Sequence, residues 1–130
     1  MNQKKALFID DDSAYLNKLI KAVKLLGYDC RMMSDSQQAA ELVCEERFDV
    51  LVTDIAMPGK NGYELIRELR THDSGTFVIA ISGQSDENVE SQALENGADV
   101  FFTKPLELES FLSTLSYIFG EKRNNGNGLP

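Results

Sequence analysis

Residues 48–54 read FDVLVTD, a continuous apolar run that ends in an aspartate, and this stretch decides the fold class. A strand with one face in water alternates apolar and polar residues, whereas a parallel strand buried on both faces is apolar along its length. Residues 76–82, TFVIAIS, repeat the pattern and end in a serine. The two runs predict the centre of a parallel sheet that helices cover on both faces.

Short strand patterns alternate with helical patterns five times along the chain. This alternation predicts parallel strands joined by right-handed crossovers, and therefore an α/β fold with a doubly wound five-stranded parallel sheet in the order 2-1-3-4-5. Ser13 is expected to be the N-cap of the first helix, and Gly27 to follow its last turn. The expected strands are residues 5–10, 28–33, 48–54, 76–82 and 99–104. The expected helices are residues 13–26, 87–96 and 106–120, one that ends near residue 46 after a cap at Ser34 or Asp35, and one that ends near residue 70 after the loop IAMPGKNG.

The chain is expected to form one domain over residues 1–120. The remaining residues 121–130, EKRNNGNGLP, lack apolar periodicity and are expected to be a flexible tail or a truncated linker. The last helix, residues 106–120, is expected to bury one apolar face. That face consists of Leu108, Phe111, Leu112, Leu115 and Ile118.

The 130 residues carry a formal net charge of −8 and a hydrophobic fraction of 42%, values typical of a globular domain. The negative charge argues against direct binding to nucleic acid, because phosphate contacts need a basic surface. No apolar stretch approaches the roughly 18–20 residues that span a bilayer, and the N-terminus lacks a signal-peptide core, so a cytoplasmic protein without membrane contact is expected. Cys30 and Cys44 are expected to be free thiols, and His72 a solvated loop residue.

Polar side chains stand where the predicted strands end. Asp10, Asp11 and Asp12 follow the first strand, Asp54 ends the third, Ser82 ends the fourth and Lys104 ends the fifth. In open parallel sheets, ligands bind outside the carboxyl ends of the strands, at the point where the strand order reverses. In the predicted order this point lies between the first and third strands. We therefore expect these side chains to converge on one small, charged site.

The carboxylates of this cluster repel one another unless a cation offsets their charge. Mg²⁺ is the expected ion, because it prefers oxygen ligands and needs few protein carboxylates. An alternative is that Asp12 and Asp10 only cap the first helix and are exposed to solvent, and for Asp12 its place before Ser13 favours this alternative. Lys104 and Ser82 can hold an anionic group on Asp54. A carboxylate, a Mg²⁺ ion, a lysine and a hydroxyl are together the parts needed to accept a phosphoryl group.

Four motifs at these strand ends resemble the receiver domain of two-component response regulators. They are IDDD at the first strand, TDIAMPGKNG at the third, ISG at the fourth and TKP at the fifth. Each motif alone is weak, but their order and their places are specific. The resemblance extends over about residues 4–120. It implies the flavodoxin-like fold of the chemotaxis regulator and a function in a phosphorelay.

The resemblance also assigns residue roles. It implies that Asp54 accepts the phosphoryl group, and that Lys104 contacts this group. It further implies that Mg²⁺ is bound by Asp54, by Asp11 directly, by Asp10 largely through water, and by the backbone carbonyl of Ala56.

The resemblance implies a switch as well. Ser82 matches a hydroxyl that moves toward the phosphoryl group, and Phe101 matches an aromatic residue that turns inward behind it. Gly83 would leave an opening for the phosphodonor. The Lys104–Pro105 peptide bond is similar to one that is cis in this family, although an X–Pro bond is cis in only about 5–6% of cases.

Three positions leave the behaviour of the phosphorylated state open. Ala56 and Gln84 occupy positions that tune hydrolysis of phosphoaspartate in these domains. Ala56 has no polar side chain to position a water, whereas Gln84 has one. Phe101 lacks a hydroxyl, so a switch here would work by burial of the ring.

The expected partner is a histidine kinase or a histidine phosphotransfer protein. Homodimer formation is expected through the fourth helix, fifth strand and fifth helix. The chain is expected to be a self-phosphorylating acceptor, not a turnover enzyme. One alternative is a haloacid-dehalogenase-type phosphatase, with Asp10 as nucleophile and Asp12 as acid. A flavodoxin-type FMN carrier and a receiver-like binding module that is not phosphorylated are further alternatives.

Overall fold

The structure is a computed structural model that describes residues 3–57, 61–72, 75–83 and 87–124. The exposure of side chains is described up to residue 118. Five strands alternate with five helices along the chain. Within the described ranges, no helix is long and apolar enough to cross a membrane. The elements are β1 (Lys5–Ile9), α1 (Ser13–Lys24), β2 (Asp29–Met33), α2 (Ser36–Glu45), β3 (Val50–Asp54), α3 (Gly62–His72), β4 (Phe77–Ser82), α4 (Glu87–Glu95), β5 (Val100–Thr103) and α5 (Leu108–Asn124).

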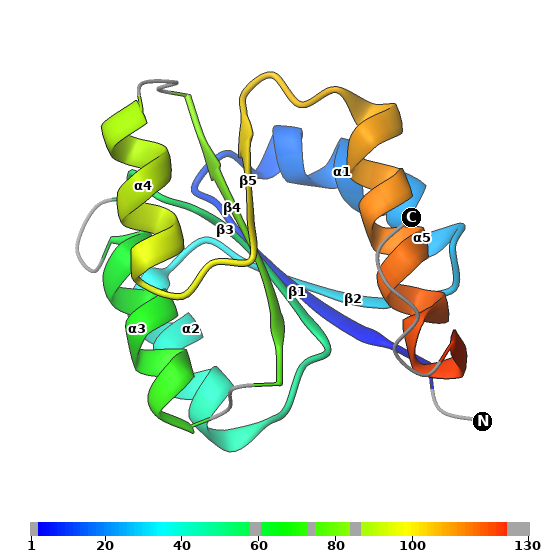
Figure 1. Cartoon of the computed structure of the whole chain (residues 1–130), viewed down its shortest axis with the longest axis horizontal. Coiled ribbons are helices and arrows are strands. Elements are labelled where there is room, and N and C mark those ends of the chain that lie inside the picture. Colours follow the sequence, from blue (N-terminus) through cyan, green and yellow to red (C-terminus); the bar gives the residue numbers. More distant parts are fainter. Residues whose placement is uncertain (1–2, 58–60, 73–74, 84–86, 125–130) are drawn as a thin grey trace.

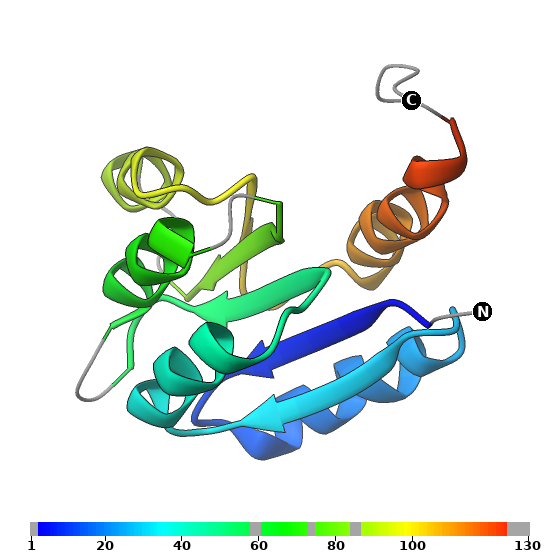
Figure 2. The same ribbon diagram turned by 90° about the horizontal axis from the view of Figure 1, so that it is seen from below.

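The strands form one parallel sheet in the order β2-β1-β3-β4-β5, as predicted. Figure 2 shows the arrows of the strands running in the same direction. Helices α1 and α5 lie on one face of the sheet, and α2, α3 and α4 lie on the other (Figure 1). The strand order reverses between β1 and β3, because the chain moves outward to β2 and then crosses back. Both central strands therefore place their carboxyl ends beside this crevice.

The two faces of the sheet build two separate cores. In β1, Leu7 and Ile9 pack under the three-helix face, whereas Ala6 and Phe8 pack under α1 and α5. Alternation is expected, since successive side chains of a strand point to opposite faces. All four side chains are at most 1% exposed. The apolar runs of the central strands are thus explained by burial on both faces.

The first turn of α1 differs from its prediction. Asp12, with φ −99° and ψ 90°, is the N-cap, and Ser13 is the first helical residue. The Asp12 carboxylate accepts a hydrogen bond from the Tyr15 N–H at 3.1 Å. Asp and Ser are similarly good N-caps, so the sequence did not separate them. The prediction of Ser13 as the cap was therefore wrong.

The last helix also differs from its prediction. It begins at Leu108, later than predicted, and extends past Gly120 to Asn124. Leu108, expected to be buried, is 45% exposed. Leu106, which precedes the helix, packs against the core under α1 and α5 instead. The boundary of the domain stays a prediction.

Three smaller predictions have mixed outcomes. Cys30 and Cys44 are free cysteines, as predicted. The Lys104–Pro105 peptide bond is cis, as the resemblance implied. His72 is exposed, but it is the last residue of α3 and not a loop residue.

Candidate functional site

Four strand ends meet at the crevice, as the sheet order requires. Asp10 directly follows β1, Asp54 ends β3, Ser82 ends β4 and Lys104 directly follows β5. Backbone hydrogen bonds hold these ends in register: the Asp10 N–H donates to the Met33 carbonyl at 3.2 Å, and the Lys104 N–H donates to the Ser82 carbonyl at 2.8 Å. The hydrogen-bonded backbone of the sheet therefore fixes the positions from which these side chains extend.

Three carboxylates form the acidic part of the site. One oxygen from each of Asp10, Asp11 and Asp54 lies within 4.8 Å of the others. Asp10 is 2% exposed and Asp54 is 6% exposed, whereas Asp11 faces solvent. Oxygen donors of high negative charge, of which one is open to water, suit a hard divalent cation such as Mg²⁺. The donor set therefore fits the ion that the sequence predicted.

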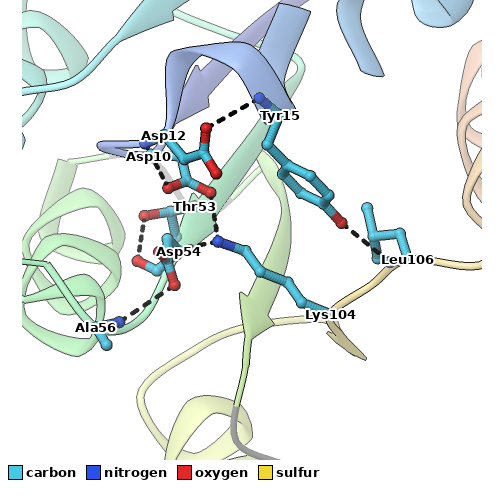
Figure 3. Close-up of polar contacts among 8 residues, drawn as sticks. All are labelled: Asp10, Asp12, Tyr15, Thr53, Asp54, Ala56, Lys104 and Leu106. Atoms are coloured by element: carbon cyan, nitrogen blue, oxygen red, sulfur yellow. Dashed lines mark hydrogen bonds and ion pairs between the residues drawn. The ribbon is translucent and has the colours of Figure 1, made fainter. Parts of the chain in front are cut away.

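Lys104 reaches across the crevice into this cluster (Figure 3). Its Nζ lies 2.8 Å from Asp10 Oδ2 and 3.3 Å from Asp54 Oδ2. Burial lowers the pKa of Lys104, but the hydrogen bond to Asp10 and the negative charge of Asp54 outweigh this effect, so the net pKa is raised. The ammonium is consequently held in its charged form between the two buried carboxylates.

The surroundings of Asp54 disfavour its charged form. Burial raises its pKa, and the neighbouring charge of Asp10 raises it further. Lys104 and the Ala56 N–H, which donates to Asp54 Oδ1 at 3.3 Å, oppose these effects only in part. Without a divalent cation the site therefore holds more negative charge than its lysine neutralises.

The consecutive aspartates of the first loop have different surroundings. Asp10 is buried, and its Oδ1 accepts the Asp12 N–H at 3.0 Å. Asp11 is the exposed member of the acidic cluster. Asp12 is the N-cap of α1 and does not belong to that cluster. The helix-cap alternative is thus confirmed for Asp12, whereas Asp10 lies in the cluster.

The predicted switch residues lie on neighbouring strands. Ser82 is 2% exposed at the end of β4, where it pairs with Thr103 of β5. Phe101 is half-buried against the core under α2, α3 and α4. At Gly83 a Cβ atom would meet nothing within 4 Å, so this side of the site is open. Gln84 lies outside the described residues.

Two residues of the site were missed by the sequence analysis. The ring of Tyr15 lies under Lys104, with Nζ 5.0 Å from the ring centroid. Gly62 is needed where α3 begins, because a Cβ atom there would lie 2.5 Å from the Asp54 carbonyl oxygen. Only the glycine had a signal in the sequence, in the turn-forming loop IAMPGKNG. Nothing in the sequence placed Tyr15 beside a loop that follows the fifth strand.

Known proteins resemble this chain in sequence. Residues 6–116 match the response regulator receiver domain. Among curated proteins, the chain is 30% identical over 109 residues to "Response regulator MprA" of Mycobacterium leprae (strain TN). This alignment covers 84% of the chain but only 48% of that protein, so the chain spans about half the length of this relative.

Solved structures resemble it in fold. A response regulator receiver domain protein (CheY-like) from Methanospirillum hungatei JF-1 has a TM-score of 0.87 at 23% identity, over 96% of this chain and all of that one. A response regulator from Burkholderia pseudomallei has a TM-score of 0.78 at 25% identity, over 97% of this chain and 77% of that one. The latter structure contains a phosphorylated aspartic acid, a calcium ion and citrate.

The family match extends over most of the chain and includes every strand end of the site. The parallel sheet in the order 2-1-3-4-5 supplies the corresponding fold. The chain therefore belongs to the response regulator receiver domain family of two-component signalling.

Proposed function

We propose that this domain takes a phosphoryl group from a phosphohistidine onto Asp54. The observation that carries this proposal is the placement of Asp54, a buried carboxylate that lies beside Asp10 and Asp11 and 3.3 Å from the Lys104 ammonium. A buried carboxylate is poorly solvated. The Lys104 ammonium offers positive charge to the oxygens of an incoming phosphoryl group, and Asp10 and Asp11 could hold a cation that does the same.

The transfer is a displacement at phosphorus. An oxygen of the Asp54 carboxylate forms a bond to phosphorus, while the P–N bond of the phosphohistidine breaks. The departing imidazole keeps the electron pair of that bond and takes up a proton. The product is an acyl phosphate on Asp54, whose added negative charge Lys104 and Ser82 can bind.

Mg²⁺, held by Asp10, Asp11, Asp54 and the carbonyl of Ala56, would neutralise charge on the transferred phosphoryl oxygens. Lys104 supplies the fixed positive charge of the chain itself. It is 2.8 Å from Asp10 and 3.3 Å from Asp54, so a small displacement carries its Nζ to an oxygen of a phosphoryl group on Asp54.

Phosphorylation would bias a two-state switch. Ser82 moves toward the phosphoryl group to donate a hydrogen bond, and the ring of Phe101 turns into the space behind it. This changes the surface of α4, β5 and α5, and with it the affinity for a partner or for a second copy of the chain. Receiver domains partner with histidine kinases, and a histidine phosphotransfer protein is an equivalent donor.

The phosphatase alternative has less support. It requires Asp12 as a general acid close to the nucleophile Asp10. The Asp12 carboxylate instead accepts the Tyr15 N–H as the cap of α1. Receiver domains are typically not turnover enzymes. Repeated hydrolysis of an added phosphoester would favour the phosphatase.

The test is intact-protein mass spectrometry after incubation with acetyl phosphate. We expect the chain to gain one phosphoryl group in the presence of Mg²⁺ and none in excess EDTA. Asp54→Asn should abolish the gain, because an amide oxygen is a poor nucleophile. Asp12→Asn is the matched control, since it makes the same chemical change two residues from Asp10 and keeps a good N-cap.

Two outcomes would contradict the assignment. Equal phosphorylation of Asp54→Asn and the unmodified chain would mean that another residue is the acceptor. Loss of phosphorylation in Asp12→Asn would mean that the third aspartate belongs to the reacting site. Transfer from a phosphorylated histidine phosphotransfer domain, followed in the same way, tests the donor.

A further inference from the structure

Tyr15 joins helix α1 to the segment that carries Lys104. Its ring faces the ammonium, with Nζ 5.0 Å from the ring centroid. Its hydroxyl oxygen accepts the Leu106 N–H at 3.0 Å. Both contacts come from one side chain in the first turn of α1 (Figure 3). Tyr15 therefore holds the chain on both sides of Pro105.

The ring completes the surroundings of the Lys104 ammonium. Asp10 and Asp54 bind Nζ through single oxygens at 2.8 and 3.3 Å, and the aromatic face covers a further side. A lysine ammonium within about 6 Å of a ring centroid is attracted by the ring quadrupole. The flexible four-carbon stem of lysine would otherwise let the ammonium leave for solvent. The side chain of Lys104 is 23% exposed, so such an exit is open.

The hydroxyl restrains the backbone just beyond Lys104. Leu106 packs partly against the core under α1 and α5, and its N–H donates to the Tyr15 hydroxyl oxygen of α1. Tyr15 is itself positioned by the N-cap, because its N–H donates to the Asp12 carboxylate. A chain of contacts thus runs from the loop after β1 to the loop after β5, two segments that the sheet order keeps apart.

We propose that Tyr15 is a positioning residue for Lys104: its ring keeps the ammonium directed at Asp54, and its hydroxyl fixes the loop that follows. The expected effect on phosphorylation rests on the proposed function of Asp54, whereas the positioning of Lys104 by Tyr15 does not. When the phosphoryl group arrives, a directed ammonium is already beside the reacting carboxylate, so little reorganisation is needed. Tyr15 does not touch the reacting atoms and acts only through Lys104.

The test separates the ring from the hydroxyl. Tyr15→Leu removes both contacts but keeps apolar packing against the core, whereas Tyr15→Phe keeps the ring and loses the acceptor. Tyr117→Leu is the matched control, because Tyr117 is half-buried against the same core but lies on α5 outside the site. All four chains are labelled with acetic anhydride in Mg²⁺-free buffer. The rate at Lys104 is measured by peptide mass spectrometry relative to the exposed lysines of α1, namely Lys18, Lys21 and Lys24.

We expect Tyr15→Leu to raise the relative labelling rate of Lys104 about two- to five-fold, in proportion to the lost ring interaction. Tyr15→Phe should label at the rate of the unmodified chain, and so should Tyr117→Leu. With acetyl phosphate and Mg²⁺, Tyr15→Leu should gain phosphoryl about two- to five-fold more slowly than Tyr117→Leu. If Tyr15→Phe is phosphorylated at the rate of the unmodified chain, the effect of Tyr15→Leu is due to loss of the ring.

Two results would overturn the proposal: Lys104 labelling in Tyr15→Leu equal to that in Tyr117→Leu, or equal phosphorylation rates of these two variants. A different result bears on the proposed function alone. If the unmodified chain gains no phosphoryl group, the role of Asp54 fails, whereas the labelling rates still decide whether Tyr15 holds Lys104.

Discussion

Two clusters of charge lie at opposite ends of the sheet, and they are built differently. At the carboxyl end, Lys104 faces the carboxylates of Asp10 and Asp54. At the amino end, Arg70 of α3 donates to the Thr76 carbonyl at 2.7 Å and to the Gly97 carbonyl at 2.7 and 3.0 Å. It also donates to the Asp99 carboxylate at 3.0 Å.

The difference lies in how charge is balanced. The guanidinium of Arg70 meets mostly neutral carbonyl oxygens and one carboxylate, which itself accepts the Val78 N–H at 2.8 Å. The cationic cluster is therefore balanced by the protein itself. The acidic cluster is not, since burial and Asp10 raise the pKa of Asp54. The charges at the amino end are therefore paired within the protein, whereas the carboxyl end carries excess negative charge that a bound cation could offset.

The largest effect on stability should come from the amino end. Arg70→Met keeps much of the apolar stem but leaves the Thr76 and Gly97 carbonyls without their charged donor. Hydrogen bonds to charged groups contribute about 1.5–3 kcal/mol each, so we expect the free energy of unfolding to fall by about 2–3 kcal/mol. Urea denaturation measures the change.

Arg67→Met is the matched control for that variant. Arg67 lies on the same helix, is exposed, and donates to the Asn96 side chain at 3.0 Å. Its replacement should cost less than about 0.5 kcal/mol. Equal losses for the two variants would mean that the carbonyl contacts of Arg70 add nothing to stability.

A second variant tests the same cluster from its other side. Gly97 has φ +120°, and a Cβ atom there would lie 2.8 Å from Cγ of Arg70. Gly97→Ala should therefore lower the free energy of unfolding by about 1–3 kcal/mol, through backbone strain and displacement of the arginine. Gly83→Ala, where a Cβ meets nothing within 4 Å, should change it by less than about 0.5 kcal/mol. In an Arg70→Met background the cost of Gly97→Ala should shrink, because the methionine side chain lacks the hydrogen bonds that hold Arg70 in place and can move away from the added Cβ atom.

The two ends also differ in how far the sequence predicts them. The sequence predicts that the side chains of the acidic site lie close together, because each stands at the end of a strand and the sheet order makes those ends neighbours. These residues are Asp10, Asp54, Ser82 and Lys104. The partners of Arg70 are mainly backbone carbonyls, which have no residue-type signal. The positions of these carbonyls relative to Arg70 depend on the packing of α3 and on the path of the turn before β5. No local sequence pattern predicts either.

Long-range contacts and the ends of helices are the other features that the sequence does not predict. Tyr15 contacts Leu106 because the first turn of α1 lies beside the loop after β5, and no local periodicity predicts such a long-range contact. Gly120 was interpreted as a helix end, but α5 continues to Asn124. A glycine inside a helix costs only about 1 kcal/mol, which neighbouring residues can offset. Local signals therefore predicted elements well and their ends poorly.

At the acidic end, removing a charge should stabilise the fold. The folded-state pKa of Asp54 is raised above the ordinary value of 3.8, so the folded state holds its proton more tightly than the unfolded state. Stability from this group is thus greatest at low pH and is lost as the pH rises through its folded pKa. In Mg²⁺-free buffer at pH 7, Asp54→Asn should therefore raise the free energy of unfolding.

The pH dependence distinguishes this explanation from a packing effect. The advantage of Asp54→Asn over the unmodified chain should be small near pH 4 and should grow toward pH 7, as followed by urea denaturation across that range. Asp12→Asn, which changes an exposed cap, should show no such growth. An advantage of Asp54→Asn that is independent of pH would assign it to packing instead of charge.

The smallest expected effect is the stabilisation of the fold by Mg²⁺, which should depend on the acidic cluster and not on the Arg70 cluster. A cation that binds only the folded state stabilises it by RT ln(1 + [L]/Kd), which is about 1.4 kcal/mol at ten times Kd. We expect Mg²⁺ to raise the thermal unfolding midpoint of the unmodified chain and of Arg70→Met alike, because the amino-end cluster has no share in the site. Asp11→Asn removes the solvent-facing carboxylate of the acidic cluster and should reduce this gain while leaving the Mg²⁺-free midpoint nearly unchanged. If Asp11→Asn kept the full gain, the ion would be acting elsewhere on this acidic chain, and the excess charge beside Asp54 would need another counterion.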